Sequence, residues 1–244
     1  DSAHTMPPFK AGGANTAIQS AHNLAWKLAA VIDGAAEPPL LDTFNAERHP
    51  VGRFSARQSL TGPSVALLGL DREAPGLPAD EEAAMFDLLV GYQYRSTAVV
   101  SGDPVTADLD AVQLVGELRG QPGTRVPHAW VRRGDDRVST LDLLGPGFTM
   151  LAGDAGASWC ASAAFASSTL GVPVTVHRIG TDGDVVDVVD VEGQWAASTG
   201  LAPEAALLVR PDDVVGWRVD TMPEDPDKQL CQALSAILGR GPDL

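Results

Sequence analysis

The feature that most constrains this chain is a bend rich in proline and glycine that leads directly into a helix-forming segment. Residues 7–13 read Pro-Pro-Phe-Lys-Ala-Gly-Gly, and residues 14–32 contain many alanines but no proline or glycine. The first N–H groups of a helix lack intrahelical acceptors and carry partial positive charge. The bend therefore predicts a place where main-chain amides meet an anion or the electron-rich edge of a ring. Such a contact makes residue 1 an improbable natural start, so we expect the chain to be the back part of something larger.

Length and composition indicate a globular protein. The 244 residues suffice for one large domain or two small ones, and 44% of them are hydrophobic. No apolar run reaches the roughly 18 residues that a membrane span needs, and no signal peptide is visible. The two cysteines, Cys160 and Cys231, are far apart, which favours reduced thiols and a cytoplasmic location.

The charge distribution argues against a nucleic-acid partner. The formal net charge is −15, and all of it resides in residues 61–244, because acidic and basic residues balance in residues 1–60. An acidic surface repels a phosphate backbone. The five histidines and two cysteines show no ligand-like spacing, so we expect no metal site.

Two helices are expected near the N-terminus. Apolar residues recur every three to four positions in the first one: Ile18, Ala21, Ala25, Leu28 and Ile32. Asn15 or Thr16 is expected to cap its start and Gly34 to end it. A second helix is expected over 40–60, with Pro50 kinking or restarting it.

The apolar residues expected to line this second helix are Leu41, Phe44, Val51 and Phe54. Beyond it, residues 61–79 resemble a loop, and Asp80 is expected to cap a short helix over 81–90. Residues 92–100 alternate as a strand does, and residues 102–110 have the composition of a linker.

A second domain is expected to start near Leu118, with strands and helices in alternation. Strand-like runs lie at 129–131, 148–152, 172–179, 206–209 and 214–219. Helical patterns lie at 157–170, 195–199 and 228–238. This alternation predicts the α/β class, with a partly parallel sheet covered by helices.

Several strings of residues point to one family. Residues 1–4 read Asp-Ser-Ala-His, residues 23–28 read Asn-Leu-Ala-Trp-Lys-Leu, and residues 41–51 fit Leu-Asp-X-Phe-X-X-Glu-Arg-X-Pro-Val. With Gly-Tyr-Gln-Tyr-Arg-Ser at 91–96, they resemble the single-component FAD-dependent aromatic hydroxylases of the para-hydroxybenzoate hydroxylase type. Leu-Val-Arg-Pro-Asp at 208–212 resembles the extra thioredoxin-like domain of phenol- and polyketide-hydroxylating members.

The resemblance implies three parts. Residues 1–60 would be the C-terminal segment of an FAD-binding domain, with the flavin loop and helices. Residues 61–117 would connect the FAD and substrate region, and residues 118–244 would form a thioredoxin-like domain. No G-x-G-x-x-G follows a strand, so the N-terminal FAD-binding part is expected upstream in the same natural chain or on a separate one.

The activity implied is that of a flavoprotein monooxygenase. NAD(P)H would reduce FAD, O₂ would add to give a flavin hydroperoxide, and an oxygen atom would pass to a small aromatic or polyketide substrate. This chain alone is not expected to be active, and a homodimer is possible. The alternative that stays open is a non-catalytic thioredoxin-like interaction module with a vestigial flavin motif.

The resemblance also assigns residues to the cofactor. Asp1 would accept a hydrogen bond from the ribityl chain of FAD, and Pro8 would lie along the flavin ring with the backbone of Gly12, Gly13, Ala14 and Asn15. The amides of Ala14 and Asn15 would stabilise negative charge on the reduced flavin. No catalytic side chain is identified.

Other polar residues near the bend admit two interpretations. His4 either approaches the flavin or makes a structural hydrogen bond, and Lys10 either tunes the flavin's charge or points to solvent. Arg48 and Glu47 suggest an ion pair at the surface or between domains.

Among the aromatic residues, Trp26, Tyr92 and Tyr94 are expected to pack, although one tyrosine could line a substrate channel. Trp159 and Cys160 occupy the place of a thioredoxin active site, but Ala163 replaces the second cysteine. Dithiol exchange needs that thiol, so a redox role for Cys160 is the weaker interpretation. The domain is expected instead to cover the substrate region or to make a dimer contact.

Overall fold

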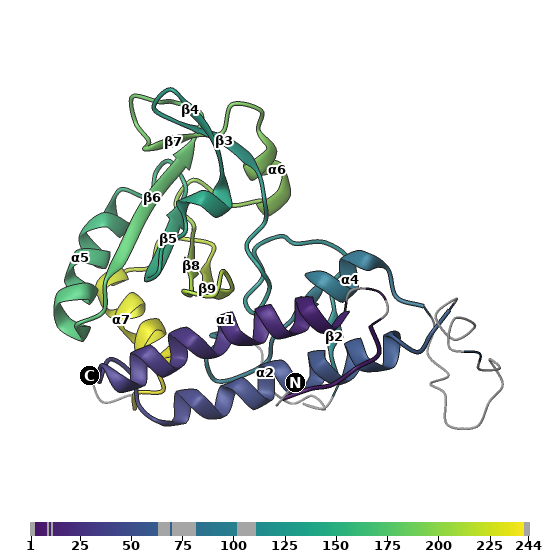
Figure 1. Cartoon of the computed structure of the whole chain (residues 1–244). Coiled ribbons are helices and arrows are strands. Elements are labelled where there is room, and N and C mark those ends of the chain that lie inside the picture. The colour runs from purple at the N-terminus through teal and green to yellow at the C-terminus, as the bar shows by residue number, and fades with distance from the viewer. Residues whose placement is uncertain are drawn as a thin grey trace.

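Two long helices lie side by side under a sheet domain (Figure 1). The computed structural model describes residues 3–8, 10, 12–62, 69, 82–101 and 111–241. Helix α1 covers Gly12–Ile32 and helix α2 covers Pro39–Gln58. The turn between them meets the C-terminal end of the chain, where Glu37 N–H donates to the Leu238 carbonyl.

The helix ends differ in part from the sequence-based expectation. Helix α1 begins at Gly12, so Asn15 and Thr16 lie inside it and not before its first turn. Gly34 has a φ of 71° just after the last turn, which confirms it as the terminating residue. Helix α2 runs through Pro50 without restarting. Proline removes only one intrahelical hydrogen bond, and the packing of α2 against α1 keeps the two halves in one helix.

The face of α1 that packs inward is the opposite of the one its apolar stripe suggests. Ile18 is 68% exposed and Ile32 79% exposed, while four polar side chains are buried: Thr16, Ser20, Asn23 and Lys27. On α2, likewise, Glu47 and Arg48 are buried. The amphipathic pattern was therefore correct for a helix, but it did not indicate which face packs inside this chain.

A short connector follows the two helices. Helix α4, Met85–Leu89, starts after Ala84, and its expected cap, Asp80, lies outside the described residues. Most of the expected loop at 61–79 and the whole linker at 102–110 also lie outside them.

The strand expected over 92–100 is much shorter. Strand β1, Tyr92–Gln93, pairs antiparallel with strand β2, Gln113–Leu114. After Gln93 the backbone bonds elsewhere: Tyr94 N–H donates to Gly123 and Val100 N–H to Gly216. The connector is therefore bound to the sheet domain through irregular backbone.

The sheet domain contains seven strands in the order β4-β3-β7-β6-β5-β8-β9. Their bounds are Trp130–Arg133 (β3), Asp136–Ser139 (β4), Phe148–Ala152 (β5), Val174–Gly180 (β6), Val188–Val189 (β7), Ala206–Val209 (β8) and Val215–Val219 (β9). Strands β5, β6 and β7 pair in parallel, and the outer pairs are antiparallel. The sequence missed β4, which is polar, and β7, which has only two residues.

Helices cover both faces of this sheet (Figure 1). They are η1 (Thr140–Leu143), α5 (Ser158–Leu170), α6 (Gln194–Thr199) and α7 (Pro226–Ile237). Neighbouring strand residues point to opposite faces: Met150 packs with α5 and α7, and Leu151 packs in a second cluster with Trp195 of α6. The β5–α5–β6 unit, the β8–β9 hairpin and α7 form the expected thioredoxin-like α/β arrangement.

An aromatic contact joins α1 to this domain. Trp26 is buried, as expected, and its ring meets Phe148 of β5 edge to face, with centroids 6.0 Å apart. The helices and the sheet domain therefore share one apolar core.

A buried cluster of charges joins the same two parts. The Glu47 carboxylate accepts hydrogen bonds from Lys27 at 2.8 Å, from both terminal nitrogens of Arg210 at 2.7 and 2.9 Å, and from Ser96 at 2.6 Å. Arg210, which follows β8, also binds Asp212 at 2.6 Å. The expected pairing of Glu47 with Arg48 is wrong, because successive residues of a helix point in different directions. Glu47 still forms an ion pair between the two parts.

The charges of this cluster shift the ionisation of its members. Burial alone would raise the pKa of Glu47, but the charges of Arg210 and Lys27 outweigh it and hold the pKa well below its usual range. Burial lowers the pKa of Lys27 to about 8, because the attraction of Glu47 only partly offsets the lost hydration. The charge of Glu47 is therefore stabilised mainly by Arg210, whereas burying the charge of Lys27 costs free energy that Glu47 only partly offsets.

The two cations should consequently differ in their effect on stability. Arg210→Met leaves the carboxylates of Glu47 and Asp212 buried without their shared partner, and should lower the free energy of unfolding by about 3–5 kcal/mol. Lys27→Met leaves Glu47 bound to Arg210 and should change it by less than about 1 kcal/mol. Urea unfolding of both variants measures the difference, and equal losses would contradict this account.

Stability should also fall in acid. The folded-state pKa of Glu47 lies below its unfolded value, so the contribution is complete above the unfolded pKa and is lost as pH falls toward the folded pKa. We expect the free energy of unfolding to decline below about pH 4. Glu47→Gln, which cannot ionise, should show a shallower decline over the same range, and an unchanged slope would be the contrary result.

Candidate functional site

The residues expected at the flavin lie around the start of α1. Asp1 lies outside the described residues. The others differ in exposure: Pro8 and Ala14 are exposed, Gly13 and Asn15 half-buried, and Gly12 buried. The structure therefore gathers Pro8 and residues 12–15 within one bend and one helical turn.

The partial positive charge at the start of α1 is not offset by an acidic side chain of its first turn. The first amides of the helix have no intrahelical acceptor. The start of α1 therefore carries the partial positive charge of a helix N-terminus without an acidic side chain of its own first turn to offset it.

The two glycines at the start of α1 differ in how much room the chain leaves for a side chain. A Cβ on Gly12 would lie 3.2 Å from the sulfur of Met6, so close packing inside the chain favours glycine there. A Cβ on Gly13 would meet only Met6 Cγ, at an ordinary 3.6 Å. Within the described chain nothing forbids a side chain at Gly13, which fits a backbone that a flat ring approaches from outside.

His4 makes a structural contact, one of the two roles that the sequence left open. Its Nε2 lies 2.9 Å from Ser20 Oγ on α1. Its ring also packs on Gly52 of α2, where a Cβ would come within 2.9 Å of His4 Cδ2. Burial, helped by the positive charge of Arg48, lowers the pKa of His4. The imidazole is therefore neutral at pH 7.

Lys10 does not point to solvent. Its ammonium pairs with Glu82 at 2.9 Å and donates to Thr61 at 2.8 Å, and its side chain is only 12% exposed. The backbone at Lys10 is in the left-handed region, with a φ of 56°, which costs energy for a residue with a Cβ. These side-chain contacts stabilise the bend just before α1.

Arg48 is a buried cation bound entirely by neutral oxygens in the part of the chain that the structure describes. It donates to Ser20 Oγ at 3.0 Å, to the Thr16 carbonyl at 3.2 Å, and to the hydroxyls of Tyr94 and Tyr92 at 2.7 and 3.2 Å. The expectation that both tyrosines pack is confirmed by their burial. Sequence reasoning missed their common partner, and the only signal was the pair of tyrosines two residues apart.

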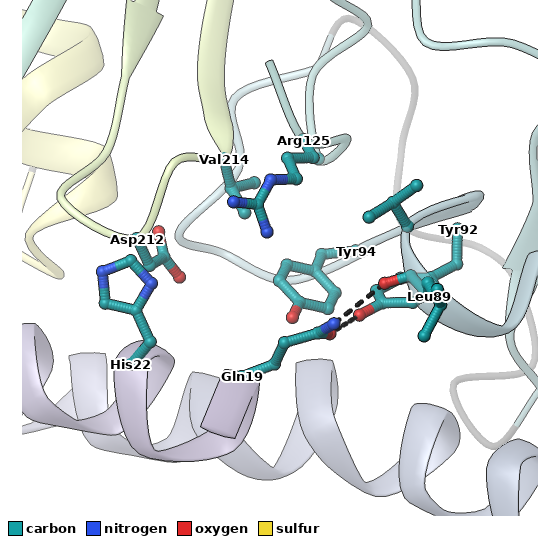
Figure 2. A pocket seen from close by; sticks show the side chains of 10 residues that line it. Gln19, His22, Leu89, Tyr92, Tyr94, Arg125, Asp212 and Val214 are labelled. Atoms are coloured by element: carbon teal, nitrogen blue, oxygen red, sulfur yellow. Dashed lines mark hydrogen bonds between the residues drawn. The ribbon is translucent and has the colours of Figure 1, made fainter. Parts of the chain in front are cut away.

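A pocket opens beside these tyrosines, between α1 and the sheet domain (Figure 2). Its empty volume is about 400 Å³ including the open mouth, and its lining includes Gln19, His22, Tyr92, Tyr94 and Arg125. Gln19 bonds to Tyr92 and to the Leu89 carbonyl, as the dashed lines in Figure 2 show.

The charged groups at this pocket are already engaged. Arg125 pairs with Asp213 at 3.1 Å, and Asp212 binds Arg210. Burial raises the pKa of Asp213, although the charge of Arg125 opposes the shift. Arg125 and Asp212, the charged side chains of the lining, are therefore held by ion pairs.

In the sheet domain, the thioredoxin-like position carries one thiol. Cys160 is exposed on the first turn of α5, and Cys231 is a half-buried free thiol on α7. Trp159 is buried, donates to the Glu204 carbonyl and packs edge to face on Trp217. Trp159 is thus a core residue, and Ala163 behind it is buried too.

Neither a metal cluster nor a membrane-spanning helix occurs among the residues that the structure describes. No group of three or more histidine, cysteine or acidic side chains is placed to hold a metal ion. Within the same residues, every helix is too short or too polar to cross a membrane.

Both parts of the chain are similar to known protein families. Residues 1–59 match the family model of an FAD binding domain, and residues 119–241 match that of the aromatic-ring hydroxylase C-terminal domain. The tetracenomycin A2 monooxygenase-dioxygenase of Streptomyces glaucescens is 42% identical over 240 residues, which are 98% of this chain and 41% of that protein. The 4-methyl-5-nitrocatechol 5-monooxygenase of a Burkholderia species is also 42% identical, with 98% and 43% covered.

A solved structure agrees with these matches. The ternary complex of aklavinone-11 hydroxylase with FAD and aklavinone superposes with a TM-score of 0.82 at 36% identity, covering 97% of this chain and 42% of that one. The chain thus spans less than half the length of these relatives. From both its domain matches and its fold, the chain belongs to the aromatic-ring hydroxylase family and carries its C-terminal domain together with part of an FAD-binding domain.

Proposed function

We propose that this chain forms one wall of the flavin site in an FAD- and NAD(P)H-dependent monooxygenase that hydroxylates an aromatic or polyketide substrate. The observation that carries the proposal is the room beside Gly13 at the start of α1, within the segment that matches an FAD-binding domain. Pro8 and the backbone of residues 12–15 would lie along the flavin ring, and Asp1 would bind its ribityl chain. Bound FAD would supply hydride acceptance and oxygen activation.

The substrate class follows from the relatives. One solved relative is a ternary complex with FAD and aklavinone, and others are named for tetracenomycin and for a nitrocatechol. We therefore propose a small aromatic or polyketide ring as the substrate. Residues 1–60 would complete the flavin site, and residues 118–244 would form the thioredoxin-like domain. Residues 61–117 would be the connector of the FAD and substrate region between them. The two free thiols favour a cytoplasmic location.

The test is to assemble the chain with the flavin-binding part that its relatives possess, as one polypeptide or two. The assembly should be yellow and should oxidise NAD(P)H when an aromatic polyketide is added, with one oxygen atom gained by the product. Absorption spectra, nicotinamide consumption and product mass measure this. A colourless assembly would favour the alternative, a non-catalytic interaction module.

Gly13→Ala sharpens this test because it separates folding from flavin binding. The new Cβ has room inside the chain, and alanine favours a helix by up to about 1 kcal/mol over glycine. Thermal stability should therefore hold or rise, whereas FAD affinity should fall by tenfold or more because the backbone can no longer approach the ring. Unchanged affinity would remove Gly13 from the flavin site.

The exposed stripe of α1 is the proposed contact with the flavin-binding part. Ile18, Leu28 and Ile32 are exposed although α1 lies inside the match to an FAD-binding domain. The polar face of α1 already packs on α2 and the sheet domain. The apolar face is therefore free to bury against the rest of that domain.

Charge on this stripe should block assembly without unfolding the chain. Ile18→Glu should change the free energy of unfolding of this chain by at most about 0.5 kcal/mol and abolish co-purification with the flavin-binding part. Val191→Glu, at another exposed apolar site 64% accessible, is the matched control and should assemble normally. If this chain alone dimerises and Ile18→Glu makes it monomeric, the stripe is instead a homodimer contact.

A further inference from the structure

We propose that Arg48 is a positioning residue for the flavin-facing segment: through Ser20 it holds His4, and with it residues 3–8, against α1 and α2. This inference rests on the proposed function, because it explains how the segment that is proposed to face the flavin is held in position. Arg48 is buried and acts through two other side chains, Ser20 and His4.

The direction of the hydrogen bonds makes the connection specific. A guanidinium can only donate, so Ser20 Oγ accepts from Arg48 Nε at 3.0 Å. The single hydroxyl hydrogen of Ser20 is then available for His4 Nε2 at 2.9 Å. His4 accepts it only as the neutral imidazole with its own hydrogen on Nδ1. Arg48 thus occupies one lone pair of Ser20 Oγ, and in the proposed arrangement the hydroxyl hydrogen goes to this form of His4.

Arg48 itself is held in place on every side. Its remaining bonds go to the Thr16 carbonyl in the second turn of α1 and to the hydroxyls of Tyr92 and Tyr94 in the connector. A lysine has one ammonium in place of a planar fork and cannot reach all of these acceptors together. The guanidinium therefore fixes the start of α1, the connector and the Ser20 hydroxyl relative to one another.

An independent packing feature points to the same anchor. The His4 ring lies against α2 at Gly52, where a Cβ would come 2.9 Å from its Cδ2 and 3.4 Å from its Cγ. Glycine inside a helix costs about 1 kcal/mol relative to alanine. The glycine at this position is thus explained by the space that the imidazole occupies. Two features on different helices, a hydrogen bond to Ser20 of α1 and the absence of a side chain at Gly52 of α2, hold one side chain of the flavin-facing segment.

The first measurement needs no flavin. Donation from Ser20 favours neutral His4, and burial and the charge of Arg48 also lower its pKa. In this chain, nitrogen NMR should show the hydrogen of His4 on Nδ1, and Ser20→Ala should raise the His4 pKa. Ser55→Ala is the matched control, a buried serine of α2 whose hydroxyl has no partner among the described residues, and it should leave the pKa unchanged.

The second measurement uses the chain assembled with its flavin-binding part. Ser20→Ala removes the hydrogen bond, and Gly52→Ala displaces the ring while favouring the helix. Each should weaken FAD binding at least fivefold, with Ser55→Ala within twofold of the wild type. Arg48→Lys keeps the charge but loses the geometry, so it should weaken FAD binding as Ser20→Ala does.

The outcomes separate this inference from the proposed function. A yellow wild-type assembly whose Ser20→Ala and Gly52→Ala variants bind FAD normally would overturn the positioning role and leave the function standing. A colourless wild-type assembly would overturn both. If Ser20→Ala unfolds, Gly52→Ala decides, with its melting temperature as the check on folding.

Discussion

The buried carboxylate of Glu47 is the contact on which the arrangement of the two parts depends. It binds Lys27 of α1 and Arg210 beyond β8, so one side chain of α2 connects both helices to the sheet domain. A buried charge is tolerated only where partners surround it. The polar face of α1 turns inward and brings Asn23 and Lys27 to this carboxylate, and the apolar face is left outside.

This orientation has consequences at the start of α1. With Thr16 and Ser20 facing inward, Arg48 can bind both, and Ser20 can hold His4. The bend before the helix is then fixed by side chains, including Lys10, while the backbone at Gly13 stays open. The same packing that stabilises the chain thus leaves room beside Gly13, the proposed flavin contact.

Much of the sheet domain was predictable from the sequence. Phe148–Ala152 and Ala206–Val209 were predicted to the residue, because strands buried on both faces appear as short continuous apolar runs. The length of strand β1 was overestimated. Tyr94, Ser96 and Val100 form hydrogen bonds with residues that come near only when the chain is folded. The candidate flavin residues were found through sequence motifs, and the roles of Arg48, Ser20 and Gly52 were not, because each depends on side chains distant in the sequence.

From the sequence alone, residues 17–32 could be predicted as an amphipathic helix, preceded by a bend of prolines and glycines and followed by an α/β domain. The spacing of apolar residues is a local property, so it can be recognised without knowing which element the helix packs against. Only the tertiary structure decided which face of that helix is buried and which acid pairs with which base. Those choices depend on desolvation and distance between Glu47 and Arg210, which lie far apart in the chain, and no local pattern encodes either quantity.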